Sequence, residues 1–155
     1  KGQLPTVLSA LEEVQPEGKT NLGHVLTRVA SEVQKKSLIV VISDVFDSVE
    51  NVQMGIRRLR HRGNEVILFH VMAEDEVSFP FTRTTLFEGM EELPDALVDP
   101  AALRKAYIAE VEAFKTDLRR RCQQDRADYV FLNTAQPYDV PLASFLAARE
   151  RSRVR

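Results

Sequence analysis

The first residues that suggest chemistry are 18–20 ("GKT"), because a glycine-lysine-threonine run ahead of a helix ends the P-loop that cradles nucleotide phosphates. That motif needs another glycine five positions before Gly18, where Glu13 stands, and a strand leading into the loop. The preceding residues keep helical spacing instead, so we reject nucleotide binding here. The simpler expectation is that Thr20 or Asn21 caps the helix that follows.

Two aspartates in "ISDVFD", Asp44 and Asp47, follow an aliphatic segment with the composition of a parallel strand. Acidic residues at the carboxyl end of such a strand are where α/β proteins hold divalent cations, because carboxylates are hard oxygen ligands. Two plainer roles stay open: Asp44 can form an Asx-turn, and Asp47 or Ser48 can cap the next helix. We assign Asp47 mainly to capping.

Thr20 and Asp44 together indicate a more specific site. The helix that follows Thr20 leads directly into the strand that ends at Asp44, so we predict that both side chains converge on one crevice. A hydroxyl and one carboxylate supply only part of a Mg²⁺ shell, which takes about six oxygens. The other ligands must therefore come from elsewhere.

The remaining polar residues carry weaker signals. His24, His61 and His70 lack metal-ligand spacing, and His70 lies in a buried strand, where we expect a hydrogen-bonded core histidine. The arginines of 57–63 ("RRLRHRG") complement a helix dipole; the alternative is a docking patch for an acidic protein or nucleic acid, without interleaved aromatics to support the latter. The single cysteine, Cys122, is expected to be a buried thiol, which fits a reducing cytoplasm.

Composition narrows the class of protein. A chain of 155 residues with 44% hydrophobic residues predicts one compact domain, and 21 basic against 23 acidic residues favour neither nucleic acid nor a membrane surface. The aliphatic run 38–42 is far shorter than the ~18–20 residues that span a bilayer. We therefore expect a cytoplasmic single domain over 1–155, with no nucleic-acid partner and no membrane in this segment. Because the chain begins at Lys1 within a helical pattern, we expect it to be the C-terminal fragment of a larger domain.

Hydrophobic periodicity predicts the elements that position these residues. Helical spacing covers 4–14, 22–33, 49–59, 100–124 and a closing helix from 139. Unalternating β-branched runs predict strands at 37–43, 65–72 and 128–134. Residues 73–98 break this rhythm and predict an inserted surface hairpin.

These elements predict an α/β fold, a three-layer sandwich around a short parallel sheet. The strand at 37–43 is expected to be central and covered on both faces. In the closing helix, Leu142, Phe145 and Leu146 are expected to face inward, and a basic, frayed tail is expected from Arg149.

In order and spacing, seven segments resemble the carboxyl-terminal half of the bacterial domain of unknown function 58 family: "GKTNLGHVL", "LIVVISDVFD", "RRLRHRGNEVILFHVM", "TTLFEG", "LVDPAALRKAYIAEV", "DYVFLNT" and "FLAARER". The resemblance covers essentially the whole chain. Members of that family are similar to von Willebrand factor A domains, whose metal-ion-dependent adhesion site takes Asp-x-Ser-x-Ser, a threonine and an aspartate from separate loops. Thr20 matches the threonine and Asp44 the aspartate, while Asn21 stands at a usually acidic position and no Asp-x-Ser-x-Ser occurs.

The resemblance implies a truncated von Willebrand factor A-like, Rossmann-like domain that keeps the fourth to sixth strands. It implies a partial metal site of Thr20 and Asp44, which binds Mg²⁺ in the full-length protein and is expected to be empty in this fragment. It also implies an exposed edge on the 37–43 strand. We predict self-association through this edge, by strand addition or exchange between two copies.

Two function hypotheses follow. The first, implied by the resemblance, is a protein-interaction module and not an enzyme, with a metal that accepts a carboxylate from a protein partner. Relatives are often encoded beside MoxR-type AAA+ ATPases, which suggests a partner of that type. The alternative is a Mg²⁺-dependent phosphoryl-transfer or phosphodiester enzyme that uses Asp44 and Asp47, for which we find no positioned base or nucleophile.

Overall fold

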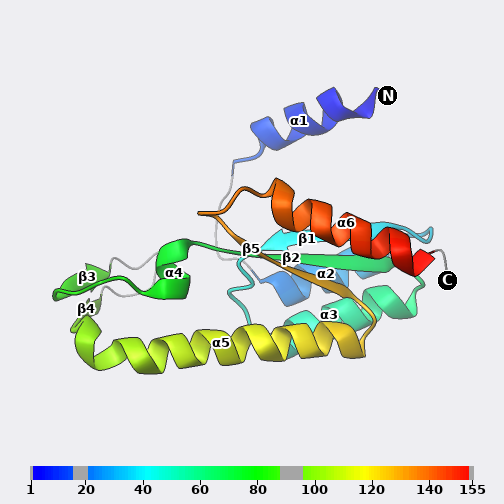
Figure 1. The fold of residues 1–155 in the computed structure, drawn as a ribbon. Coiled ribbons are helices and arrows are strands. Elements are labelled where there is room, and N and C mark those ends of the chain that lie inside the picture. Colours follow the sequence, from blue (N-terminus) through cyan, green and yellow to red (C-terminus); the bar gives the residue numbers. More distant parts are fainter. Residues whose placement is uncertain (1, 16–20, 88–95, 154–155) are drawn as a thin grey trace.

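The computed structural model describes residues 2–15, 21–87 and 96–153 and contains a parallel three-stranded sheet (Figure 1). The strands are β1 (Leu38–Ser43), β2 (Glu65–Met72) and β5 (Asp128–Asn133), in the order β1-β2-β5. Both neighbouring pairs are parallel. The three predicted strands are therefore confirmed, and their carboxyl ends lie at one edge of the sheet.

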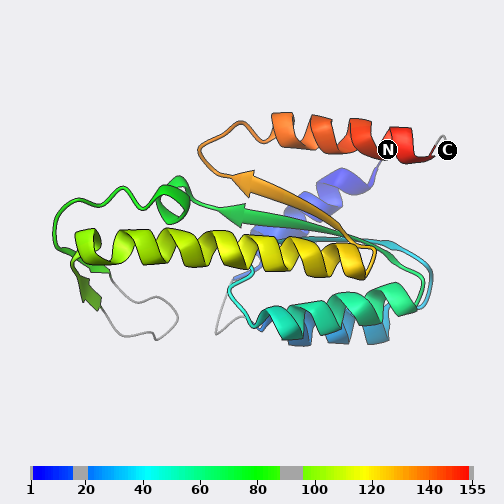
Figure 2. The ribbon, with the colours of Figure 1, turned by 60° about the horizontal axis from the view of Figure 1, so that its bottom comes forward.

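Helices cover both faces of this sheet (Figures 1 and 2). One face carries α6 (Asp139–Arg153); the other carries α2 (Leu22–Glu32), α3 (Val49–His61) and α5 (Pro100–Gln124). The helix α1 (Gln3–Glu13) lies on the α6 side, and the apolar side chains of its stripe are exposed. The prediction of a three-layer α/β sandwich is confirmed.

The core lies between the sheet and the layer of α2, α3 and α5. Its fully buried side chains come from all of these elements: Leu26, Val52, Ile56, Leu59, Leu68, Leu118 and Cys122. The helices α2 and α3 approach closely because glycines face the contact: a Cβ on Gly55 would lie 2.5 Å from Leu26 Cβ, and one on Gly23 would lie 2.6 Å from Asn51 Cβ. The expectation that Cys122 is a buried thiol is confirmed.

The central position that composition predicted for β1 was wrong, whereas the exposed edge that the family resemblance implied is present among the described residues. Instead of being central and covered on both faces, β1 lies at the edge of the sheet, and the side chains of Leu38, Val40 and Ile42 are exposed. The central strand is β2, whose residues 66–70 are all buried. Runs of consecutive aliphatic residues therefore occur both in the edge strand β1 and in the central strand β2, and periodicity alone could not distinguish the two positions.

The predicted hairpin is present, preceded by a short helix that was not predicted. This helix is α4 (Glu74–Ser78), and the antiparallel strands are β3 (Thr85–Phe87) and β4 (Ala96–Val98). The strands β3 and β4 lie beside the N-terminal half of α5, and this half of the helix extends beyond the sheet (Figure 2). Phe79 is buried there, with its ring centroid 4.6 Å from that of Tyr107.

The C-terminal expectations need two corrections. Leu146 was expected to face inward but is exposed, because α6 contacts the sheet through Phe145, whose ring centroid lies 5.9 Å from that of Phe69. Arg149 does not begin a frayed tail. It lies within α6 and pairs with Asp128 and Glu65, so it fastens the helix to two strands.

Candidate functional site

Asp44 directly follows β1 and is exposed at the carboxyl edge of the sheet. Its Oδ1 accepts hydrogen bonds from the Phe46 N–H and the Ser43 hydroxyl, both at 3.3 Å. The first of these is the bond of an Asx-turn, so this alternative is confirmed. The turn fixes one carboxylate oxygen, and Oδ2 accepts no hydrogen bond from any described residue.

The loop that carries Asp44 is held by Val45. This residue is fully buried and has a φ angle of 58°, in the left-handed region that a β-branched side chain rarely adopts. Its N–H donates to the Ser43 hydroxyl at 3.0 Å, and its carbonyl accepts from the Asp47 N–H at 2.7 Å. Such strain costs about 1–3 kcal/mol and persists only where the surroundings enforce it.

Asp47 does not cap α3, contrary to expectation. The N-cap of that helix is Ser48, whose hydroxyl accepts from the Asn51 N–H at 3.3 Å. The Asp47 carboxylate instead accepts from the Gly23 N–H at 2.9 Å and from the Ser48 N–H at 2.6 Å. Gly23 lies in the first turn of α2, so Asp47 caps α2 and not α3, although Gly23 and Asp47 are 24 residues apart in sequence.

The predicted meeting of Thr20 and Asp44 is partly outside the described residues. Asn21 caps α2 by accepting from the His24 N–H at 2.8 Å, which confirms one of the two expected caps. Thr20 belongs to 16–20, which the structure does not describe, so its position stays a prediction. What the structure places together is the first turn of α2 and the β1–α3 loop that contains Asp44.

A cavity of about 550 Å³ opens at this edge of the sheet, and we call it the edge cavity. It is lined by the β1–α3 loop, the end of β2, α4 and α5: Asp44, Val45, Phe46, Asp47, His70, Met72, Glu76, Tyr107, Glu110, Val111 and Phe114. Sequence reasoning found the two aspartates but missed Glu76 and Glu110. The only sequence signal for Glu110 was its spacing from two aromatic residues of the same helix: it lies one turn from both Tyr107 and Phe114.

His70 is a buried, hydrogen-bonded histidine, as predicted, but it also lines the edge cavity. Its Nδ1 lies 2.9 Å from the Tyr129 hydroxyl. Burial is the main cause that lowers the pKa of His70 to about 4. The Asp44 backbone raises this pKa, the charge of Lys115 lowers it, and the charge of the Asp44 carboxylate raises it. The imidazole is therefore neutral at physiological pH.

The described residues do not by themselves form a metal site. No group of three or more His, Cys, Asp or Glu side chains among them is arranged to hold an ion. Asp44 offers a hard carboxylate oxygen of the kind that Mg²⁺ prefers, whereas both oxygens of Asp47 already accept backbone hydrogen bonds. Of the two aspartates, Asp44 is the one whose carboxylate keeps an oxygen without a hydrogen bond from the described residues.

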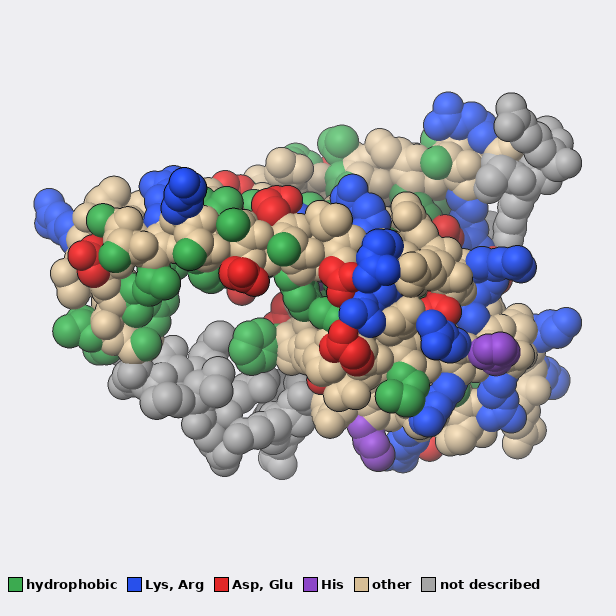
Figure 3. Space-filling model, turned by 90° about the horizontal axis from the view of Figure 1, so that it is seen from below, with side chains coloured by type: hydrophobic (Ala, Val, Ile, Leu, Met, Phe, Trp, Pro, Cys, Tyr) green, Lys and Arg blue, Asp and Glu red, His purple; other side chains and the backbone are tan. Residues whose placement is uncertain are grey.

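The arginines of residues 57–63 lie at the end of α3, where their charges complement the helix dipole as predicted, and they also have structural partners. Arg57 pairs with Asp125 at 2.9 Å, Arg58 donates to Thr27 at 3.0 Å, and Arg60 donates to the Asn64 carbonyl at 2.7 Å. Arg62 donates to the carbonyl of Ala30. Basic side chains gather where these helices end (Figure 3), and these bonds tie α3 to α2 and to the end of α5.

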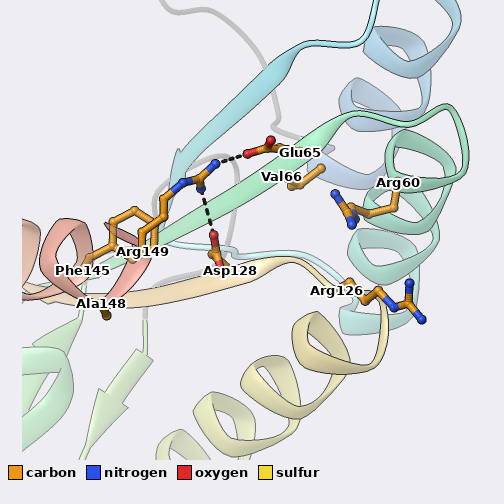
Figure 4. Close-up of a pocket in the computed structure, with 8 residues that line it drawn as sticks. All are labelled: Arg60, Glu65, Val66, Arg126, Asp128, Phe145, Ala148 and Arg149. Carbon is orange, nitrogen blue, oxygen red and sulfur yellow. Dashed lines mark hydrogen bonds and ion pairs between the residues drawn. The ribbon is translucent and has the colours of Figure 1, made fainter. Parts of the chain in front are cut away.

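A second cavity, of about 480 Å³, lies at the opposite edge of the sheet (Figure 4). Arg149 projects from α6 between Glu65 on β2 and Asp128 on β5, with its Nη1 3.0 Å from an Asp128 oxygen. Arg60 and Arg126 also line this cavity. The carboxylates there already pair with Arg149, so the cluster joins α6 to the sheet.

The fold and the edge loops define the class of this protein: a parallel α/β sandwich with acidic loops at the carboxyl ends of its strands. The chain belongs to the family described as "Protein of unknown function DUF58", whose model matches residues 1–117. No curated protein and no solved structure matched the chain. Within the described ranges, no helix is long and apolar enough to cross a bilayer.

Proposed function

We propose that this chain is a protein-interaction module of von Willebrand factor A-like architecture and not an enzyme, with a divalent-cation site to which Thr20 and Asp44 contribute oxygens. The observation that carries the proposal is the hydrogen bond from the Gly23 N–H to Asp47. It joins the loop that contains Asp44 to the first turn of the helix that follows Thr20 in sequence. Two segments that are distant in sequence thus reach one edge of the sheet.

The local geometry supports Asp44 as a ligand. The Asx-turn holds its carboxylate by one oxygen, and the buried, left-handed Val45 holds the turn itself. A carboxylate fixed in advance binds a cation with less loss of side-chain freedom. A Mg²⁺ ion bound there would offer a coordination position to a carboxylate of the partner.

The partner that we propose is a MoxR-type AAA+ ATPase in the cytoplasm. Family membership supports this choice, because the resemblance described above links the family to such ATPases.

The test measures binding of the full-length protein to the purified ATPase in constant Mg²⁺, which keeps the ATPase supplied with its own metal. The variant is Asp44→Asn, whose amide oxygen can still accept from the Phe46 N–H but carries no charge for a cation. We expect the affinity to fall by at least about tenfold. Mg²⁺ binding to the full-length protein alone, followed by calorimetry, should weaken in the same variant.

Glu32→Gln is the matched control, because Glu32 is an exposed carboxylate at the far end of α2 that pairs only with Arg28 among the described residues. We expect it to bind the ATPase and Mg²⁺ as the wild type does. Unchanged Mg²⁺ binding in Asp44→Asn would overturn the metal site. Weaker Mg²⁺ binding with unchanged affinity for the ATPase would overturn the choice of partner.

The alternative, a Mg²⁺-dependent phosphoryl-transfer or phosphodiester enzyme, has less support. It needs Asp47 as a second catalytic carboxylate, and that side chain is occupied by two backbone N–H groups. Hydrolysis of bis(p-nitrophenyl) phosphate that is lost in Asp44→Asn would favour this alternative over an interaction module.

A further inference from the structure

We propose that the edge cavity binds the cationic side chain of a lysine or arginine presented by a segment of a protein partner. This site goes beyond the cation site proposed above, because its ligand is an organic cation and it needs no metal ion. Three features of the molecule support this site: the acidic lining of the edge cavity, a buried nitrogen of His70, and an adjoining apolar cavity.

The charged groups that line the edge cavity are all acidic. They are the carboxylates of Asp44, Asp47, Glu76 and Glu110, and no described lysine or arginine lines it. Glu76 uses Oε2 to accept from the Ala73 N–H at 2.6 Å, which leaves Oε1 for a ligand, and Glu110 is exposed. The cavity therefore presents hydrogen-bond acceptors and negative charge, which complement an ammonium or guanidinium group.

His70 gives a second, independent sign of a ligand. Its Nε2 is fully buried and makes no well-formed hydrogen bond with a described residue, although the Asp44 backbone acts on the ring and raises its pKa. Nδ1 faces the Tyr129 hydroxyl on β5, so Nε2 points away from β5, and His70 lines the edge cavity. In the tautomer that carries its proton on Nδ1, this proton is donated to Tyr129 and Nε2 offers a lone pair, which an entering N–H donor would satisfy.

The walls of the edge cavity suit the stem of a long basic side chain. Met72, Val111 and Phe114 are apolar, and aliphatic stems of lysine and arginine pack well on such surfaces. Tyr107 and Phe114, which also line the cavity, are aromatic, and aromatic rings attract cations. A simple metal ion would gain nothing from these contacts, whereas an organic cation would.

A neighbouring cavity of about 390 Å³ points to a polypeptide as the source of this cation. It shares Glu76 and Tyr107 with the edge cavity and is lined by an aromatic cluster of Phe79, Phe81 and Phe87. The two cavities together fit a segment in which an apolar residue lies close to a lysine or arginine.

The probe for this site is a fluorescein-labelled octapeptide of alternating arginine and leucine, titrated with the full-length protein by fluorescence polarisation in EDTA. Its matched partner carries citrulline, an uncharged isostere, in place of arginine. We expect the citrulline peptide to bind at least tenfold more weakly. Glu110→Gln should weaken binding of the arginine peptide about tenfold, the loss expected for one charge-assisted hydrogen bond.

The control variant is Glu112→Gln, which makes the same charge change two residues further along α5. Glu112 pairs with Lys115 and does not line either cavity, so we expect no loss of binding. Equal losses of peptide binding in both variants would show that binding depends only on the net charge of the protein, and would overturn the proposal. Equal binding of the citrulline peptide would overturn it too.

Two further readings complete the test. On addition of the arginine peptide, the ¹⁵N signals of the His70 ring should change, and the citrulline peptide should leave them in place. Competition by free arginine at the same concentration as the peptide would overturn a polypeptide ligand. Because EDTA is present throughout, failure here leaves the metal-dependent function proposed above untouched, and success does not depend on it.

Discussion

The carboxylate of Asp47 accepts a hydrogen bond from the backbone N–H of Gly23 at 2.9 Å. This bond satisfies an amide in the first turn of α2, which has no partner within its own helix. It also fixes the distance between that turn and the loop after β1. A single side chain thus links the loop after β1 to the first turn of α2.

Asp47→Ala should destabilise the fold, because it leaves the Gly23 and Ser48 amides without their acceptor. Gly23 is buried, so we expect the free energy of unfolding to fall by about 1–3 kcal/mol. Urea unfolding followed by circular dichroism measures this change. Glu12→Ala, at an exposed position of α1, should change it by less than about 0.5 kcal/mol, and similar losses in both variants would contradict the role of Asp47.

Gly55→Ala should also destabilise the fold, through the contact of α2 with α3. The new Cβ would lie 2.5 Å from the Leu26 Cβ and 3.3 Å from the Gly23 carbonyl oxygen, so the helices must separate. We expect a loss of about 1–3 kcal/mol in the free energy of unfolding, typical of overpacked cores. At Gly2 a Cβ would meet nothing within 4 Å, so Gly2→Ala is the control that should change little.

Much of the fold could be predicted from the sequence, because helical and strand periodicities are local properties. The long helix begins with Pro100 after the Asp99 cap, as its residues indicated. Composition could not place β1, since a run of aliphatic residues fits a central or an edge strand alike; only the family resemblance implied its exposed edge.

The candidate site was predicted less completely, for a different reason. Asp44 could be found because strand-end acids follow a rule of α/β folds. The bond of Asp47 to Gly23, and the opening of His70 into a cavity beside Glu76 and Glu110, depend on contacts between distant elements. No local pattern encodes such contacts.

His70 should make stability depend on pH between about 4 and 6.5. Its pKa falls from 6.5 to about 4 on folding, chiefly because burial disfavours the imidazolium. The unfolded chain therefore binds the extra proton first, and stability present above pH 6.5 is lost as the pH falls toward 4. As the pH falls through this range, the free energy of unfolding of the wild type should decrease by up to about 1.4 kcal/mol per pH unit more than that of His70→Gln. Parallel pH profiles from urea unfolding of the two proteins would contradict this assignment.

Cys122 should be unreactive in the folded protein. Burial raises the pKa of its thiol to about 12, and the charge of Asp125 adds to the effect, so little thiolate forms at neutral pH. Ellman's reagent should modify it at least about a hundred times more slowly than a cysteine placed at the exposed Ser9. In urea the two rates should converge. Rapid modification of Cys122 in the folded protein would contradict this prediction and would show that this part of the core opens frequently.

The exposed side of β1 should promote self-association of the chain. Among the described residues β1 pairs only with β2, so its outer edge carries backbone groups that can pair with another strand. The side chains of Leu38, Val40 and Ile42 add apolar surface beside that edge. Two copies that paired there would bury both features at once, which makes pairing favourable at high protein concentration.

Ile42→Lys tests this prediction, because Ile42 is 70% exposed and a charge on an edge strand opposes pairing. Sedimentation velocity should show a mass that rises with concentration for the wild type and stays monomeric for the variant. The control is Leu97→Lys, which makes the same change at a residue that is 73% exposed on the remote hairpin. If Leu97→Lys abolishes association and Ile42→Lys does not, the copies meet through the hairpin and the edge of β1 is not the contact. The two apolar residues are equally accessible, so any difference between the variants reports the strand edge and not general hydrophobicity.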